Sequence, residues 1–177
     1  MTVVDSAPPA LVFGIYSLLL VVAALCDAWK LIVPNVIPSA LTALFIVAAA
    51  VQPGQVHWLS HFGAAAAVLA AGLAFFTWGW LGGGDVKLIA ALSLWTGFAH
   101  LLDLLVAISL AGGALALVLV VARRLARALR AGTPGLADTP PIRILALGES
   151  VPYAVAIAPA AIYVGTLLPF LGSSPGT

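Results

Sequence analysis

The sequence predicts an all-α protein, a polytopic integral membrane bundle of six transmembrane helices that forms a single domain over residues 1–177. Two observations lead to this prediction. Hydrophobic residues make up 63% of the chain and charged residues only 7%, whereas a soluble domain carries roughly 25% charged residues. The apolar runs are rich in Ala and Leu without the alternation of a strand, which favours helices as the spanning elements.

Six apolar segments are each long enough to cross a bilayer, which takes about 20 helical residues. The first begins close to the N-terminus, but no positively charged stretch precedes it, so we interpret it as a retained span and not as a signal peptide. The apolar stretch 86–122 would be roughly 55 Å long as one helix, far beyond a bilayer core of about 30 Å. It must therefore turn back on itself near Thr96–Asp103. The predicted spans are about 9–27, 36–52, 59–78, 86–100, 103–122 and 151–171.

The positions of the charges predict the orientation. With six alternating spans, all seven Lys and Arg residues lie on one side of the membrane and all three His residues on the other. Because Lys and Arg favour the cytoplasmic side, both termini should face outward. The basic loop 123–150 should face the cytoplasm. Its first part could extend the fifth span as a helix along the anionic inner leaflet, with an ordinary positive-inside anchor as the alternative.

Two carboxylates, Asp27 and Asp85, reach the same inner depth in this topology. Each has a structural alternative: Asp27 could pair with Lys30 at the interface, and Asp85 could be the N-cap of the fourth span. Two carboxyls close together cannot easily both ionise, so one keeps its proton and can donate to a substrate carbonyl while the other activates water. The pair thus predicts aspartic-protease chemistry, which requires no metal and no cofactor.

The residues around the two aspartates are candidates for supporting roles. Gly82–Gly84 could adopt positive φ and let an extended peptide approach Asp85, with a flexible loop before a helix as the alternative. Lys30 and Lys87 could stabilise a carboxylate or contact the substrate, with interfacial snorkelling as the alternative. Pro34 and Asn35 should end the first loop, with Asn35 as the N-cap of the second span.

Three sequence stretches resemble a known family. "GGGDVKL" (82–88) resembles the GxGD motif of intramembrane aspartyl proteases. "DAWKLIVPN" (27–35) is similar to the D-x-x-[RK]-x-x-x-P-N stretch of type IV prepilin peptidases, and "PYAVAIAPAA" (152–161) resembles the Pro-Tyr-Ala segment of their last helix. Their order, spacing and topology match over about residues 10–171.

The resemblance implies a membrane-embedded aspartic endopeptidase that cleaves the leader peptide of prepilins at the cytoplasmic face of the bacterial inner membrane. It implies that Asp27 and Asp85 are the catalytic pair. The residues that match the other motif positions are Lys30, Pro34, Asn35, Gly82, Gly83, Gly84, Lys87, Pro152 and Tyr153.

Larger members of this family carry a cytoplasmic insertion with paired CxxC motifs, which is associated with N-methylation of the new pilin end. Here only "AWKLIVPN" joins the first two spans, and the single cysteine, Cys26, excludes such a zinc site. The chain therefore resembles the short form found with Tad/Flp pilus systems, and N-methyltransferase activity is not expected. The expected partners are a Flp-type pilin precursor and the lipid bilayer. Nucleic acid is not expected, because only one loop is basic.

Two other classes of function compete with this interpretation. A proton- or ion-coupled transporter would use the aspartates as a relay, but it should carry acidic residues through the membrane depth, and here they cluster at one edge. A non-catalytic assembly subunit of a pilus or secretion system would tolerate asparagine at both aspartates.

Overall fold

The computed structural model describes residues 9–52, 54, 56–131, 151–168 and 171, and in these ranges it contains six α-helices and no strand. The all-α prediction is confirmed. The helices are α1 (Pro9–Lys30), α2 (Val36–Val51), α3 (Trp58–Thr77), α4 (Gly83–Thr96), α5 (Leu101–Ala131) and α6 (Ala154–Gly165).

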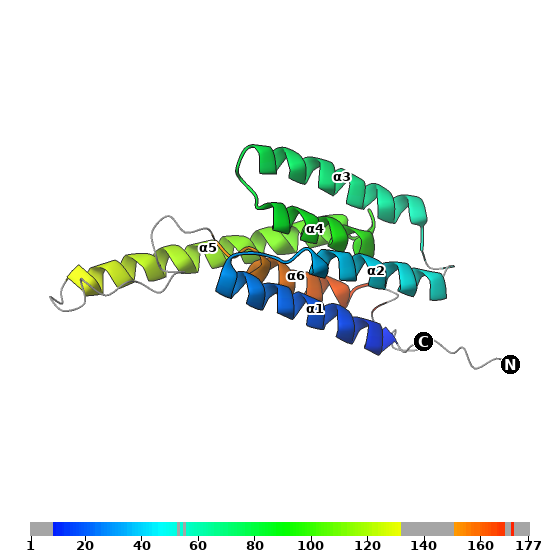
Figure 1. Ribbon diagram of the computed structural model, residues 1–177, viewed down its shortest axis with the longest axis horizontal. Helices are drawn as coiled ribbons and strands as arrows, with labels where there is room; N and C mark the ends of the chain where they lie inside the picture. The colour runs from blue at the N-terminus through cyan, green and yellow to red at the C-terminus, as the bar shows by residue number, and fades with distance from the viewer. Residues whose placement is uncertain (1–8, 53, 55, 132–150, 169–170, 172–177) are drawn as a thin grey trace.

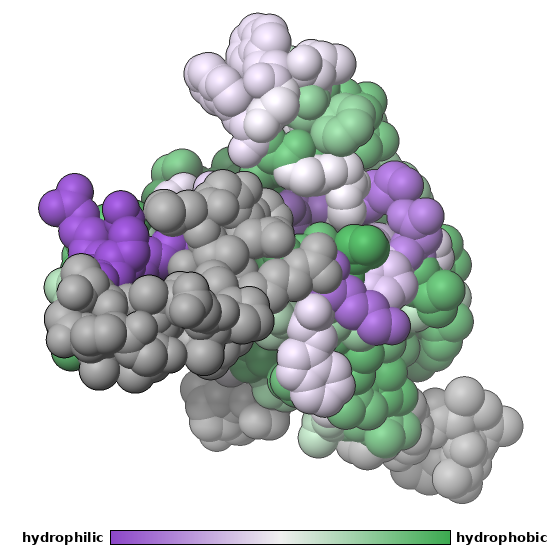
Figure 2. Space-filling view, turned by 60° about the vertical axis from the view of Figure 1, so that its left-hand side comes forward, coloured by the Kyte–Doolittle hydropathy of each residue, from purple (hydrophilic) through white to green (hydrophobic). Residues whose placement is uncertain are grey.

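Three of the helices are long and apolar enough to cross a membrane by length and composition. These segments are Ala10–Lys30, Trp58–Thr77 and Leu101–Leu129. The apolar helices α2 and α6 are shorter, with 16 and 12 residues, so the count of six spans stays a prediction. Large apolar side chains are exposed on the outside of the helices, and hydrophobic residues cover much of the face shown in Figure 2. This surface is suited to a lipid bilayer.

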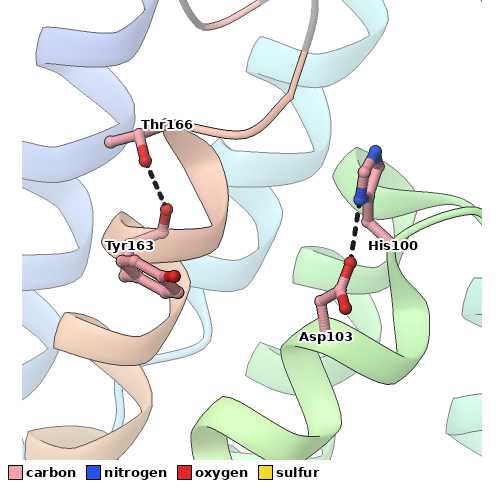
Figure 3. Close-up of polar contacts among 4 residues, drawn as sticks. All are labelled: His100, Asp103, Tyr163 and Thr166. Atoms are coloured by element: carbon pink, nitrogen blue, oxygen red, sulfur yellow. Dashed lines mark hydrogen bonds and ion pairs between the residues drawn. The ribbon is translucent and has the colours of Figure 1, made fainter.

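The predicted turn within the long apolar stretch is present. Helix α4 ends at Thr96, Gly97 follows with a φ of 56°, and α5 begins at Leu101. Next to this turn His100 Nδ1 lies 2.9 Å from Asp103 Oδ2 (Figure 3). At the C-terminal end of α6 the Thr166 hydroxyl donates to the Tyr163 carbonyl at 2.6 Å (Figure 3).

Helix α5 is longer than the predicted fifth span. Its 31 residues continue through Arg123, Arg124 and Arg127 and project beyond the other helices (Figure 1). The first part of the predicted loop 123–150 is therefore helical, whereas residues 132–150 lie outside the described part. That the basic end of α5 lies along the inner leaflet stays a prediction.

The centre of the bundle is α4. Helices α2, α3, α5 and α6 all pack against it, and α1 packs against α2 and α6 (Figure 1). Every residue from Leu88 to Thr96 is buried, as expected for a helix that is apolar on all sides. The Trp95 ring packs against Tyr16 and Phe45, at centroid distances of 5.1 and 5.6 Å, and its Nε1 donates to the Leu41 carbonyl at 3.2 Å. This packing fixes the position of α4 relative to α1 and α2.

The contact between α3 and α4 depends on a glycine. A Cβ placed on Gly72 would lie 2.7 Å from Val86 Cγ1 and 3.3 Å from Cγ2. Val86 is buried and β-branched, so its side chain cannot rotate away freely. Any larger residue at position 72 would have to push the two helices apart.

We therefore expect Gly72→Ala to destabilise the protein by about 1–3 kcal/mol through overpacking. The measurement is the melting temperature in detergent, with unfolding monitored by circular dichroism. The matched control is Gly14→Ala in α1, where no atom lies within 4 Å of the added Cβ. That change should leave stability unchanged or raise it, since alanine favours a helix by about 1 kcal/mol over glycine. Equal melting temperatures for the two variants would contradict this account of the α3–α4 contact.

Candidate active site

Asp27 lies near the C-terminal end of α1, and its position is set by the start of α6. The side chain is only 5% exposed, and its Oδ2 accepts a hydrogen bond from the backbone N–H of Ala154 at 2.8 Å. Ala154 is the first residue of α6, whose early N–H groups have no partner within the helix. The buried carboxyl therefore satisfies one of these N–H groups and joins the two helices.

This arrangement does not support the structural alternative for Asp27. Lys30, the last residue of α1, is exposed, and within the described residues it forms no ion pair with Asp27. Three residues of separation place the two side chains on neighbouring parts of one helix. The buried carboxyl instead faces α6, while the ammonium stays at the surface.

Asp85 lies in the first turn of α4, at the third helical position. The N-cap of α4 is Gly82, so the alternative of Asp85 as the N-cap is wrong. The half-buried Asp85 carboxyl instead accepts a hydrogen bond from the backbone N–H of Gly82. This is how the third residue of a capping box reaches back over the start of a helix. A side chain at position 82 would have to displace the Asp85 carboxylate, because a Cβ on Gly82 would lie 2.8 Å from Asp85 Oδ2.

The structure brings the two aspartates into one cleft of about 500 Å³. Asp85 lies just before the predicted fourth span, which begins at residue 86. Burial raises the pKa of the Asp85 carboxyl to about 7, and the nearby charge of Asp27 adds to the increase. Two carboxyls that interact strongly share a proton over part of the pH range and titrate as a pair, so this arrangement can supply one acid and one base.

The three glycines before Asp85 allow other parts of the chain to approach closely, and they do so without unusual backbone angles. Among the described residues, the glycines with positive φ are Gly79 and Gly97, so Gly82–Gly84 do not use the positive φ that glycine allows. A Cβ on Gly84 would lie 3.1 Å from Val33 Cβ and 3.4 Å from the Val33 carbonyl oxygen. The absence of a side chain at Gly84 thus lets the connection between α1 and α2 lie directly on the first turn of α4.

This connection carries a strained residue that the sequence does not reveal. Leu31 has a φ of 54°, in the left-handed region, and its N–H donates to the Asp27 carbonyl at 2.8 Å as α1 ends. A left-handed conformation costs a residue other than glycine about 1–2 kcal/mol. The strained residue lines the aspartate cleft, where stored strain often accompanies function.

Asn35 occupies the N-cap position of α2, as predicted, but its side chain makes no capping hydrogen bond. Its Oδ1 accepts instead from Lys87 Nζ at 2.9 Å. The capping role predicted for the Asn35 side chain is therefore wrong, because the amide oxygen is bound to the lysine of another helix. The structure directs Lys87 toward Asn35, and both side chains lie at the edge of the cleft.

The predicted site residues divide into two groups. Pro34, Asn35, Gly82–Gly84 and Lys87 line the cleft with both aspartates. Lys30, Pro152 and Tyr153 do not. Tyr153 occupies the N-cap position of α6 and lines a separate cavity beside α5. Pro152 and Tyr153 thus come directly before Ala154, whose backbone N–H binds Asp27, but they do not line the cleft themselves.

Residues 14–117 match the model of the type IV leader peptidase family. This range is more than half of the chain and includes both aspartates, the connection between α1 and α2, and the glycines before α4. No curated protein and no solved structure matches the chain.

The hydrogen bond between Asp27 and Ala154 predicts different effects for two substitutions at one position. Asp27→Asn keeps an oxygen that can accept from Ala154, so the fold should be nearly as stable as the wild type. Asp27→Ala leaves the buried N–H without a partner and should cost about 1–3 kcal/mol.

The measurement is again thermal unfolding in detergent, with Asp85→Ala as the control. Asp85 is half-buried and its partner Gly82 is exposed, so water can replace the lost acceptor there. A melting temperature for Asp27→Ala equal to that for Asp27→Asn would show that the hydrogen bond does not hold α1 and α6 together.

Proposed function

Because the chain belongs to the type IV leader peptidase family, we propose that it is an aspartic endopeptidase, embedded in the bacterial inner membrane, that cleaves the leader peptide of prepilins at the cytoplasmic face. The observation that supports this proposal best is the position of Asp27 and Asp85. The two carboxyls come from helices far apart in the sequence, yet they line one cleft and interact electrostatically.

The proposed reaction uses the pair as one acid and one base. The ionised carboxyl takes a proton from water, whose oxygen attacks the scissile carbonyl carbon, while the protonated carboxyl donates to the carbonyl oxygen. When the tetrahedral intermediate collapses, the C–N bond breaks and the leaving amine takes a proton from a carboxyl. Acid and base belong to the pair as a unit, because the two groups titrate together.

The cleft walls suit an extended peptide. Ile32, Val33 and Pro34 form one wall and Gly82–Gly84 form part of another. An extended substrate has unpaired backbone groups, and it can approach a wall without side chains more closely than a wall that carries them. The Lys and Arg residues gather on one side of the predicted topology, the side of the two aspartates, which would place this cleft on the cytoplasmic side.

The form of the connection between α1 and α2 supports the short, Tad/Flp-type member as the specific assignment. Leu31–Asn35 is all that separates the two helices, which leaves no inserted domain at this point. The proposed substrate is therefore a Flp-type pilin precursor, and methylation of the product is not part of the proposal.

We expect Asp27→Asn and Asp85→Asn each to lower the rate of leader cleavage by at least about a hundredfold, the usual contribution of a positioned acid or base. The assay is incubation with a candidate Flp-type prepilin in detergent, followed by mass measurement of the product. The matched control is Asp103→Asn in the first turn of α5, which lies outside the aspartate cleft and should cleave at the wild-type rate. Full activity in either variant of the pair would show that these carboxyls do not act in catalysis and would favour an assembly subunit.

The shared proton predicts a bell-shaped dependence of kcat/KM on pH. At low pH both carboxyls are protonated and no base is present, so activity should rise as the first proton leaves. A carboxyl whose pKa is raised to about 7 stays protonated below that value, so the acid is lost, and activity falls, as the pH rises through about 7. The measurement is the rate of prepilin cleavage at fixed ionic strength. A rate that stays constant from mildly acidic to alkaline pH would contradict a shared proton.

A further inference from the structure

A second cleft, of about 680 Å³, lies between α2 and α3 with α4 as its floor. Both helices pack against α4, but they have little contact with each other, which leaves the space between them open. The residues that line it are mostly apolar, and five of them are alanines. Those from α2 include Ser39, Ala43 and Ile46, those from α3 include Phe62 and Ala66, and those from α4 include Ala90 and Ala91. We call this cleft the α2–α3 groove.

The α2–α3 groove joins the aspartate cleft. Asn35 and Lys87 line both, and the hydrogen bond between their side chains lies at the junction. An apolar cavity on the other side of α3, between α3 and α5, shares no lining residue with the aspartate cleft. Of these two spaces, the α2–α3 groove is therefore the one that leads from the aspartates into the apolar part of the bundle.

The length of the groove can be estimated along α2. Asn35 and Ile46 are eleven residues apart in the sequence, which is about 16 Å at the helical rise. This is about half of a bilayer core of roughly 30 Å. A chain that occupies apolar surroundings at this depth must pair its backbone groups internally, so it must be a helix. Small side chains on the groove walls let such a helix approach closely.

We propose that the α2–α3 groove binds an apolar helix of the substrate, the segment that directly follows the scissile bond. This inference rests on the proposed function, because it takes the aspartate cleft as the point of cleavage. Since the leader is released on the cytoplasmic side, the chain that enters the groove is the part C-terminal to the cut. About eleven residues of it lie in the groove, parallel to α2. Specificity then depends on a membrane helix next to the cut as well as on the residues at the cut.

The first experiment compares two alanines of α3. Ala66 lines the α2–α3 groove and Ala71 lines the cavity on the other side, and both are exposed. Replacement by phenylalanine should therefore leave the fold intact in both cases. With a candidate full-length Flp-type prepilin in proteoliposomes, Ala66→Phe should lower kcat/KM about tenfold, which corresponds to about 1.4 kcal/mol of lost binding. Ala71→Phe should match the wild type.

The same two variants are then given a peptide that ends a few residues after the cut. Removal of the segment that follows the cut should lower the wild-type kcat/KM, and the difference between the two variants should disappear. If both variants cleave the full-length precursor equally, the groove is not used by the substrate and the inference fails. If the wild type cleaves no precursor, or if Asp27→Asn still does, it is the proposed function that fails.

A second measurement does not depend on activity. Ser39→Cys and Ile46→Cys are each introduced into a Cys26→Ser, Asp85→Asn background, and single cysteines are scanned along the precursor after the cut. Both engineered positions are exposed in the groove, seven residues apart. The precursor position that cross-links to Ile46→Cys should lie about seven residues beyond the one that cross-links to Ser39→Cys, since two parallel helices rise equally. Absence of cross-links, as when only lipid fills the groove, or the opposite order, would overturn the inference.

Discussion

The hydrogen bond from the Ala154 backbone N–H to Asp27 joins the first helix of the bundle to the last. Without a donor at this point, a carboxyl that is almost fully buried would lose its contacts with water and gain nothing in return. The N-terminus of α6 supplies this donor, and the packing of α6 along α1 keeps it in position. The depth and direction of the Asp27 side chain are therefore determined by the contact between these two helices.

The second aspartate depends on the central helix. α4 is surrounded by four other helices and is buried from Leu88 onward, so its first turn is the part left open to solvent. Asp85 and the glycines before it lie in this turn. Gly84 and Gly72 let neighbouring segments approach α4 closely on two sides. Because α4 is tightly packed and its first turn is accessible, it holds the Asp85 carboxyl at a constant position relative to the Asp27 carboxyl.

The two clefts suggest how chemistry in water and recognition in lipid are combined. The aspartate cleft contains both carboxyls and is lined in part by Gly82–Gly84, which suits the proposed hydrolysis of an extended peptide. The α2–α3 groove is apolar and extends about halfway along a membrane span. Between the aspartate cleft and the α2–α3 groove lies one hydrogen bond, which joins the exposed side chains of Lys87 and Asn35. Such a bond contributes little to stability, so an entering chain could displace it at small cost.

The sequence by itself determined the helical class, the division of the 86–122 stretch into two helices, and the two aspartates as a pair. These features follow from the lengths of the apolar runs and the order of the charges. Both act either within one segment or through the contact of that segment with the membrane. It did not reveal the binding of Asp27 to Ala154, the left-handed Leu31, or the Lys87 partner of the Asn35 side chain, and it left open which backbone angles Gly82–Gly84 adopt. Only the tertiary structure decided these features. The two side-chain contacts depend on which segments meet in space, and partners separated by 52 and 127 residues leave no periodic signal in the sequence.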